Sequence, residues 1–423
     1  RLPGDPPRPV AAGGAAGGLV DAGGARDDAV LSGALDGAAV VVDALLGTGF
    51  SGAPREPVAG AIAAVNDADA PVVACDVPSG VNASTGEIEG DAVRADVTAT
   101  FHGPKIGLSV APGTFHSGRI EVIEIGIPHG APGGSAAGLI SDRVLELVPH
   151  RARDGSKFSS GTLVVAGGAA GYTGAPCMTA LGAQRTGAGY VQLAVPESAQ
   201  QAVALRLLEA VTRGLPEEDG MHVPAGAEQV GELAERAGAV VLGPGLGRSD
   251  GAREFARAVA RSIEVPLLVD ADGLNAHVEA LDVLRGRPGP TVLTPHAGEL
   301  ARLLDTESDD VSAHRLERAR DAAERTGAIV VLKGDDTIVA APGGPVAVSP
   351  GATAALATAG TGDVLSGVIG ALLSKGLDPF AAAAAGVLAH ARAGKVAAGR
   401  LGADHVVAGD VIEALPEAFA ASR

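Results

Sequence analysis

Short runs rich in valine, isoleucine and leucine recur along the chain, with few polar residues between the apolar ones. In the first third of the chain they occupy residues 39–47, 70–80, 95–101 and 120–126. Buried parallel strands have this near-continuous apolar pattern because helices cover both faces of their sheet. The sequence therefore predicts a parallel sheet in this region.

The apolar pattern stops at 130–138, which reads GAPGGSAAG, and a second series of strands follows. Glycine, serine and proline interrupt regular structure, so we place a domain boundary there. The second series comprises GTLVVAG, YVQLAVP, AVVLGPG, VPLLVDADG, TVLTPH and AIVVLKG. These strands alternate with segments such as 310–328, whose apolar positions suit an amphipathic helix. Alternating strands and helices predict a doubly wound α/β fold, which binds ligands beyond the carboxyl ends of its strands.

Composition adds limits on partners and location. A length of 423 residues with 46% hydrophobic content suits two domains, at roughly 150 residues each. The net charge of -18 argues against nucleic acid or an anionic membrane as a partner, because both would be repelled. Cys75 and Cys177 are expected to be small buried hydrophobes in a reducing cytoplasm. We expect small-molecule substrates and a homo-oligomer.

The first residue is Arg1, and a segment rich in proline, glycine and alanine follows it. We expect the chain to be a fragment that has lost its natural beginning.

Residues 357–367 read ATAGTGDVLSG and predict a loop that holds an anion. Gly360, Gly362 and Gly367 let the backbone approach a ligand, and a helix starting near Asp363 directs its first N–H groups outward. The stretch lacks the lysine of a Walker A loop. By position alone, Asp363 is equally a helix cap or a base that takes a proton from an attacking hydroxyl.

Other stretches carry weaker signals. VVLKGDDTIVA, at 330–340, predicts a hairpin turning at Gly334, Asp335 and Asp336. LTPHAGEL, at 293–300, ends a strand and offers His296 and Glu299, which face either solvent or a ligand. GPGLG and GGAAGYTGA are strand-then-glycine loops that are not specific alone.

Together, GGAAGYTGA, GPGLG, VDADGLN, LTPHAGEL, LKGDDT and ATAGTGDVLSG resemble the ADP-dependent NAD(P)H-hydrate dehydratases of the ribokinase-like superfamily. The resemblance covers 139–423. It implies repair of hydrated NADH and NADPH (NADHX and NADPHX): ADP phosphorylates the ring hydroxyl, and phosphate leaves to restore the double bond. The products would be AMP, phosphate and the repaired cofactor.

The resemblance also implies roles for particular residues. Those expected to bind the hydrate are Ala175, one of Gly245 and Gly247, His296 and Asp363. Those expected to contact the nucleotide are Lys333, Gly334, Asp335, Asp336, Thr337, Gly360, Thr361 and Gly362. Asp363 would be the general base, the N–H groups of 360–363 would stabilise the transferring phosphoryl group, and magnesium would accompany the nucleotide.

In the first domain, VVVDALLGTGFSGAPRE, ACDVPSGVNASTG and ADVTATFHGPKIGL resemble the NAD(P)H-hydrate epimerase domain, over 1–134. The fold implied is an incomplete Rossmann-like α/β domain followed by the ribokinase-like doubly wound α/β domain. Asp43, which alone is equally a loop cap, would bind potassium with Ser79. Asp76 would move the ring proton in epimerisation. The residues expected to face the hydrate are Gly47, Thr48, Gly49, Phe50, Ser51, Gly52, Ala53 and Asp76.

One departure from the epimerase pattern lowers the expected activity. The family's Asn-Asn-Gly-Gly-Asp loop belongs upstream, yet this chain has only the glycines of AAGGAAGG at 11–18. We therefore predict little or no epimerase activity. A small-molecule kinase, such as one for a vitamin precursor, stays open as an alternative with the first domain as a binding module. The sequence alone does not distinguish ADP from ATP.

Overall fold

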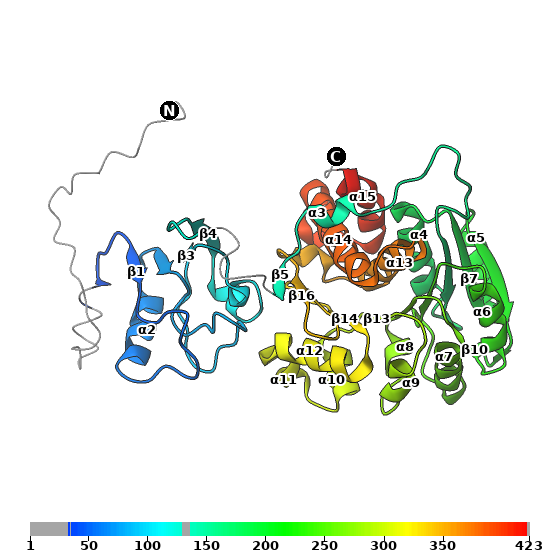
Figure 1. Cartoon of the computed structure of the whole chain (residues 1–423), viewed down its shortest axis with the longest axis horizontal. Coiled ribbons are helices and arrows are strands. Elements are labelled where there is room, and N and C mark those ends of the chain that lie inside the picture. Colours follow the sequence, from blue (N-terminus) through cyan, green and yellow to red (C-terminus); the bar gives the residue numbers. More distant parts are fainter. Residues whose placement is uncertain (1–32, 34, 129–135, 421–423) are drawn as a thin grey trace.

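The computed structural model describes residue 33, residues 35–128 and residues 136–420, which form two α/β domains (Figure 1). The glycine run at 11–18 and most of the predicted boundary at 130–138 lie outside the described residues. The expected division at 134 to 139 therefore stays a prediction.

The first domain is built on a four-stranded parallel sheet in the order β1-β2-β3-β4. Its strands are β1 (Val41–Asp43), β2 (Val72–Cys75), β3 (Val97–Phe101) and β4 (Arg119–Ile123). Each falls within or overlaps a predicted apolar run, so the prediction of a parallel sheet is confirmed. The helix α2 (Val58–Asp67) packs Ile62 and Val65 against Val41 and Val72. Two 3-10 turns, η1 (Ile106–Leu108) and η2 (Gly113–His116), lie between β3 and β4.

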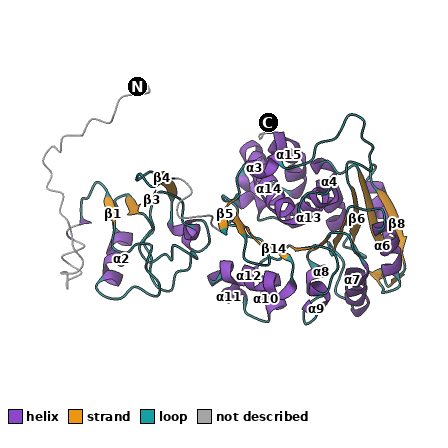
Figure 2. Cartoon of the chain, viewed as in Figure 1, coloured by secondary structure: helices purple, strands orange, loops and turns teal. Residues whose placement is uncertain are grey.

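The second domain is built on a ten-stranded sheet that is mostly parallel (Figure 2). In spatial order its strands are β5 (Ala137–Leu139), β16 (Val346–Val348), β15 (Ile338–Ala340), β14 (Ile329–Leu332), β13 (Thr291–Leu293), β12 (Leu267–Val269), β11 (Ala239–Leu242), β6 (Thr162–Ala166), β7 (Tyr190–Pro196) and β8 (Val211–Leu215). β15 runs antiparallel to β14 and β16, so the predicted hairpin at 330–340 is confirmed. A short pair, β9 (Glu217–Glu218) and β10 (Met221–His222), stands apart.

Helices cover both faces of this sheet. On one side lie α3 (Arg143–Glu146), α4 (Gly174–Thr186), α5 (Glu197–Arg206), α13 (Thr361–Ser374), α14 (Pro379–Leu401) and α15 (Ala408–Ala420). On the other lie α6 (Gly226–Ala234), α7 (Asp250–Ser262), α8 (Asp272–Asn275), α9 (Leu281–Arg285), α10 (Ala297–Leu304), α11 (Ser308–Ala313) and α12 (Arg315–Thr326). Further 3-10 turns are η3 (Ala354–Leu356) and η4 (Ala403–His405). The doubly wound prediction is confirmed.

The second domain has two hydrophobic cores, one on each face of its sheet, because successive side chains of a strand point to opposite faces. In β6, Leu163 and Val165 join the core under α13, whereas Val164 and Ala166 join the opposite core. All five residues of this strand are buried, which explains its unbroken apolar sequence.

The segment at 310–328 differs from the prediction because it contains two helices, α11 and α12, that meet at His314. His314 has φ -122° and ψ 42°, which is not helical. Its Nδ1 lies 3.1 Å from Oε1 of Glu87 in the first domain. The break therefore occurs where the segment contacts the other domain, which helical periodicity does not encode.

No helix among the described residues is long and apolar enough to cross a membrane.

Candidate active site

A cavity of about 450 Å³ lies where β14, the β14–β15 turn and the N-terminus of α13 meet. Its lining includes many of the residues predicted to contact the nucleotide: Lys333, Gly334, Asp335, Thr337, Thr361 and Gly362. The strand-end turn and the helix start are thus adjacent in space. This arrangement gives one continuous candidate site at the position expected in a doubly wound sheet.

Close helix packing fixes the N-terminus of α13 at this cavity. A Cβ on Gly367 would lie 2.0 Å from the carbonyl oxygen of Thr179, so only glycine allows α13 to approach α4 this closely. Gly360 is the N-cap and has φ 91°, a left-handed conformation that glycine adopts readily. Gly360 has no side chain that could cap the helix, and Asp363 lies in the first turn. The first N–H groups of α13 can therefore bind an anion, and the choice between cap and base for Asp363 stays a prediction.

Asp363 lies in the first turn of α13 and has an unusual acidity. Burial and the neighbouring Asp270 together raise its pKa to about 7, although Lys333 acts in the opposite direction. A carboxyl group with a pKa near neutrality is a far better proton acceptor than an ordinary aspartate, once ionised.

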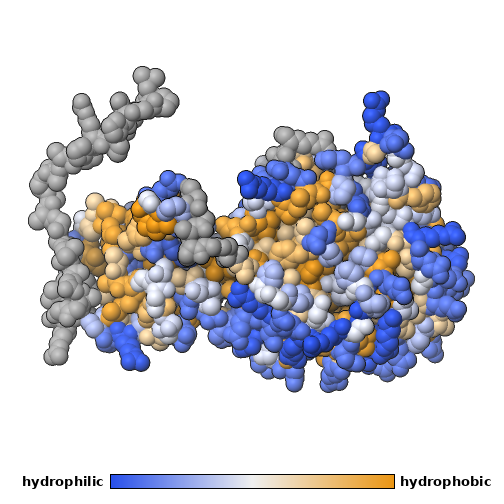
Figure 3. Space-filling view, viewed as in Figure 1, coloured by the Kyte–Doolittle hydropathy of each residue, from blue (hydrophilic) through white to orange (hydrophobic). Residues whose placement is uncertain are grey.

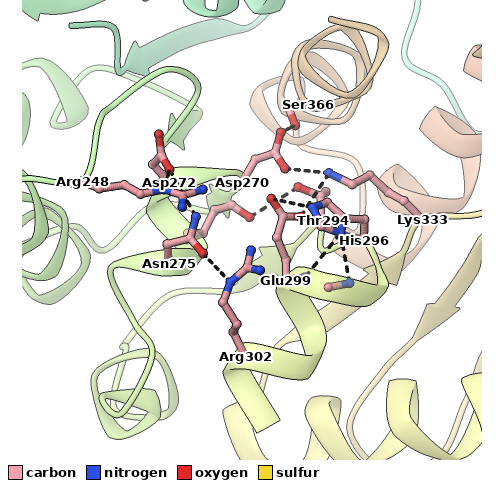
Figure 4. Close-up of polar contacts among 12 residues, drawn as sticks. Arg248, Asp270, Asp272, Asn275, Thr294, His296, Glu299, Arg302, Lys333 and Ser366 are labelled. Carbon is pink, nitrogen blue, oxygen red and sulfur yellow. Dashed lines mark hydrogen bonds and ion pairs between the residues drawn. The ribbon is translucent and has the colours of Figure 1, made fainter. Parts of the chain in front are cut away.

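Lys333, directly after β14, is a cation that interacts with this carboxyl group. Its Nζ lies 3.0 Å from Oδ1 of Asp270 and 3.6 Å from Oε2 of Glu299 (Figure 4). Burial lowers the pKa of Lys333, but Asp270 and Glu299 outweigh that effect and the pKa is raised. A Cβ on Gly362 would be 3.6 Å from Nζ, so Lys333 reaches the helix N-terminus. The lysine is therefore a fixed positive charge beside the anion site.

Asp270 directly follows β12 and bonds to both Lys333 and Ser366. It is nearly fully buried, accepts a hydrogen bond from Ser366 Oγ at 2.7 Å, and also accepts one from Lys333 Nζ. Ser366 belongs to α13, so this carboxylate connects the helix to the sheet. Asp270 and Ser366 were not predicted as site residues, although Asp270 is a strand-end acid like Asp43 and that signal could have found it.

His296 caps α10 and is held in one orientation. Its Nδ1 accepts from the N–H groups of Gly298 at 3.0 Å and Glu299 at 3.3 Å, while Glu299 Oε2 accepts from the N–H of His296 at 2.9 Å. Burial lowers the pKa of His296, with Glu299 acting in the opposite direction. Because Nδ1 is an acceptor, the neutral ring carries its proton on Nε2. Figure 4 shows His296 beside Glu299 and Lys333.

The glycine loops after β6 and β11 also meet. A Cβ on Gly245 would lie 2.6 Å from the carbonyl oxygen of Tyr172 and 3.3 Å from Cβ of Ala175. The structure thus brings Ala175 and Gly245 together. The N–H of Gly247 instead donates to Oδ2 of Asp272 at 3.2 Å.

Asp336 and Gly360 are not among the residues that line the described cavity. The carboxylate of Asp336 is buried and accepts from Arg315 Nε at 2.9 Å and from the N–H of Ala111 at 2.8 Å. Its role in nucleotide contact stays a prediction, and its visible contacts join the two domains.

In the first domain, Asp43 and Ser79 lie together at the carboxyl ends of β1 and β2. Both are nearly fully buried, and Ser79 donates to Asp43 through its N–H at 2.8 Å and its Oγ at 2.6 Å. The loop of Gly47 to Ala53 follows β1. The oxygen atoms predicted to bind potassium are therefore adjacent.

Asp76, after β2, is held by Lys105. Its Oδ1 accepts from Lys105 Nζ at 2.6 Å and from the N–H of Phe101 at 3.0 Å. Burial alone would raise the pKa of Asp76, but the hydrogen bonds from Lys105 and Phe101 outweigh it and the pKa is lowered.

Two other features lie away from these sites. A larger hollow of about 830 Å³ is bordered by α3, α4 and α15, and the predicted site residues are not among those that line it. Within the described parts of the chain, one group of side chains could hold a metal ion: Glu87, His314 and Glu317. Their potential ligand atoms lie within 4.8 Å of one another.

Comparison with protein-family models matches residues 163–417 to NAD(P)H-hydrate dehydratase and residues 16–107 to the YjeF-related protein N-terminus. Two curated relatives are bifunctional NAD(P)H-hydrate repair enzymes. The relative from Salinibacter ruber is 42% identical over 312 residues, covering 72% of this chain and 57% of that protein. The relative from Moorella thermoacetica is 40% identical over 321 residues, covering 73% and 59%. The chain thus spans less than two thirds of the length of these relatives.

Among solved structures, an ADP/ATP-dependent NAD(P)H-hydrate dehydratase from Bacillus subtilis, co-crystallised with ATP and Mg²⁺, is similar to this chain with a TM-score of 0.59. It is 26% identical, and the similarity covers 67% of this chain and 98% of that one.

Proposed function

The chain belongs to the NAD(P)H-hydrate dehydratase family, and from that premise we propose that it dehydrates the S forms of NADHX and NADPHX with ADP as phosphoryl donor. The observation that carries the proposal is Asp363, with its pKa raised to about 7, at the N-terminus of α13. The resemblance inferred from the sequence over 139–423 supports the same activity.

The proposed reaction has two stages. The ring hydroxyl of the hydrate attacks the β-phosphorus of ADP, its proton passes to Asp363, and the bond from phosphorus to the AMP oxygen breaks. The phosphorylated intermediate then loses phosphate with the electron pair of its C–O bond. A proton leaves the adjacent ring carbon, and the double bond of the reduced nicotinamide returns. AMP, phosphate and NAD(P)H are the products.

The charges around Asp363 suit the first stage. Above pH 7 the carboxylate accepts the hydroxyl proton, and its high pKa makes that transfer favourable. Lys333 remains protonated because its pKa is raised, so it balances charge on the phosphoryl group. The N–H groups at 360–363 add preorganised donors for the same oxygens.

Magnesium is proposed to arrive with the nucleotide. Among the described residues, the group able to supply three protein ligands is Glu87, His314 and Glu317, which is not part of this cavity. Mg²⁺ commonly keeps several waters and binds phosphates with one or two carboxylates, so an all-protein cage is not required. The acids beside Lys333, including Asp363 and Glu299, suit that mode. When bound, the ion would neutralise phosphate charge.

The hydrate is proposed to lie between the glycine loop at 243–247, Ala175 and His296. Gly245 and Ala175 present a surface of small residues that the hydrated nicotinamide ring can approach closely. His296, neutral and with its proton on Nε2, can donate a hydrogen bond to the carboxamide or hydroxyl of the substrate. Whether NADHX or NADPHX is preferred stays open.

For the first domain we propose potassium binding at Asp43 and Ser79 and little or no epimerase activity. A buried carboxylate beside a hydroxyl suits a hard monovalent cation. The lowered pKa of Asp76 makes that carboxylate a weak proton acceptor, which agrees with low activity. Conversion of the R to the S hydrate by the purified chain, faster than the spontaneous rate, would refute this assignment.

The test of the main proposal is direct. The chain is incubated with S-NADHX and with ADP, ATP or no nucleotide, and absorbance of the reduced nicotinamide is followed. We expect absorbance to return with ADP and to stay low without nucleotide. A small-molecule kinase of the same fold would instead leave a stable phosphorylated product, so the absence of NADH and of inorganic phosphate would favour that alternative.

A further inference from the structure

The candidate nucleotide cavity of the second domain includes a residue of the first domain. Phe115, in η2, lines it together with Lys333, Thr361 and Leu356. Its side chain is 67% exposed, so the ring stands at the opening of the cavity and is not packed into a core.

Contacts a few residues away hold Phe115 in place. The N–H of Ala111 donates to Asp336 Oδ2 at 2.8 Å, and Asp336 is itself paired with Arg315 Nη2 at 2.8 Å. Asp336 and Arg315 are both nearly fully buried, so this junction is shielded from solvent. A buried, charge-assisted junction is not displaced easily. The segment carrying Phe115 is therefore anchored to the turn that borders the cavity.

A buried apolar contact reinforces the same anchor. Val110 belongs to the first domain, is fully buried, and lies within the core cluster beneath the second domain's sheet. Ile106 packs against the same cluster. Withdrawal of the 105–116 segment would expose these side chains to water, which hydrophobic burial opposes.

The cavity has two kinds of wall. Lys333, Gly362 and the N-terminus of α13 suit phosphate, whereas Leu356, Val387 and Ala391 are apolar and suit a base. Phenylalanine offers no hydrogen bond, so it serves the base and not the phosphates. Aromatic residues are scarce in this chain, with 7 Phe, 2 Tyr and no Trp, so an exposed ring at this opening is distinctive.

We propose that Phe115 is a nucleotide-binding residue that the first domain supplies to the second, stacking its ring on the purine of ADP. The two domains then form one nucleotide site, and the first domain contributes to nucleotide affinity whether or not it epimerises hydrates. This inference rests on the proposed function of the second domain, because it takes the cavity to be the ADP site.

The test is titration calorimetry of the full chain with ADP and, separately, with pyrophosphate, which has no base. Loss of one base–aromatic stack weakens binding measurably, so Phe115→Ala should raise the Kd for ADP about tenfold. Binding of pyrophosphate should be unchanged, and Phe115→Tyr should restore ADP affinity. In turnover assays, Phe115→Ala should raise the KM for ADP and leave kcat near that of the unmodified chain.

Phe158→Ala is the matched control, because Phe158 is also an exposed phenylalanine, at 60%, and packs on Tyr190 outside the cavity. It should leave ADP affinity unchanged. An unchanged Kd for ADP in Phe115→Ala, or equal weakening of ADP and pyrophosphate, would overturn the inference. An unmodified chain that binds ADP but does not dehydrate the hydrate would refute the proposed function alone. An unmodified chain that does not bind ADP would refute both.

Discussion

Each domain has an aspartate to which we assign proton transfer, Asp76 directly after β2 and Asp363 in the first turn of α13, and the two carboxyl groups have different surroundings. In the first domain, Asp76 is bonded to Lys105 and its pKa is lowered. In the second, burial and Asp270 raise the pKa of Asp363 to about 7, even though Lys333 lies nearby. The comparison teaches that the depth of burial and the hydrogen bonds and charges around an aspartate together decide whether it is suited to accept a proton.

The sheets of the two domains also differ in how completely they are buried. The second domain buries both faces of its sheet, which holds the N-terminus of α13 against a defined cavity. In the first domain, Val42 in β1 and Val122 and Ile123 in β4 are exposed, and hydrophobic residues reach the surface near these strands (Figure 3). The second domain is therefore the better supported place for catalysis.

The largest expected effect comes from removing the proposed base. Asp363→Asn keeps the shape of the side chain but cannot take the hydroxyl proton, so kcat should fall about 10²- to 10⁴-fold. Turnover of S-NADHX with ADP measures this. Asp404→Asn, at an exposed position in the same domain, should remain near the unmodified rate. A kcat of Asp363→Asn close to that of the unmodified chain would show that Asp363 is not the base, and the proposed difference from Asp76 would then fail.

Removing the cation beside the base should have a smaller but still large effect. Lys333→Met takes away a fixed charge that stabilises the phosphoryl group, so kcat/KM should fall about 10²-fold. The apparent pKa of Asp363 should also rise, because Lys333 opposes its elevation. Steady-state kinetics at several pH values test both expectations, with exposed Lys395→Met as control. An unshifted pH profile would show that Lys333 does not interact with Asp363.

The pH dependence of the unmodified chain should reflect Asp363. The group is active only when ionised and its pKa is about 7, so kcat/KM should be constant above that pH. Below it, activity should fall about tenfold per pH unit. A plateau that extends down to pH 5 would mean that the base has an ordinary pKa. The residual activity of Asp363→Asn should lack this transition.

The smallest effects concern stability, and they should have opposite signs in the two domains. A lowered pKa means that ionised Asp76 stabilises the fold above its unfolded pKa, a contribution lost as pH falls through the folded pKa. A raised pKa means that Asp363 ionises at a cost that is complete above about pH 7. At pH 8, Asp76→Asn should therefore lower the Tm of its domain by roughly 2 °C, and Asp363→Asn should raise that of its own. Calorimetry measures both Tm values, and shifts of the same sign in the two variants would contradict this expectation.

Much of the fold followed from local pattern. Apolar runs gave the strands because buried strands need no polar alternation, and the GDD turn gave the β14–β15 hairpin. The stretch 357–367 predicted a helix starting near Asp363, and α13 begins at Thr361.

Contacts between distant segments were not predictable in this way. Asp270 and Ser366 are 96 residues apart, and their bond depends on how α13 crosses the sheet. The break of the 310–328 helix at His314 depends on how the two domains meet, and so does the place of Phe115 in the lining of the cavity. Periodicity describes one element at a time and carries no signal for such contacts.

The most direct test of dehydration through phosphoryl transfer is the stoichiometry of one reaction. The full chain is incubated with S-NADHX and ADP, and NADH, inorganic phosphate and AMP are measured together. The account predicts that all three appear in equal amounts. AMP formed with a stable phosphorylated hydrate, or NADH formed without consumption of ADP, would contradict it.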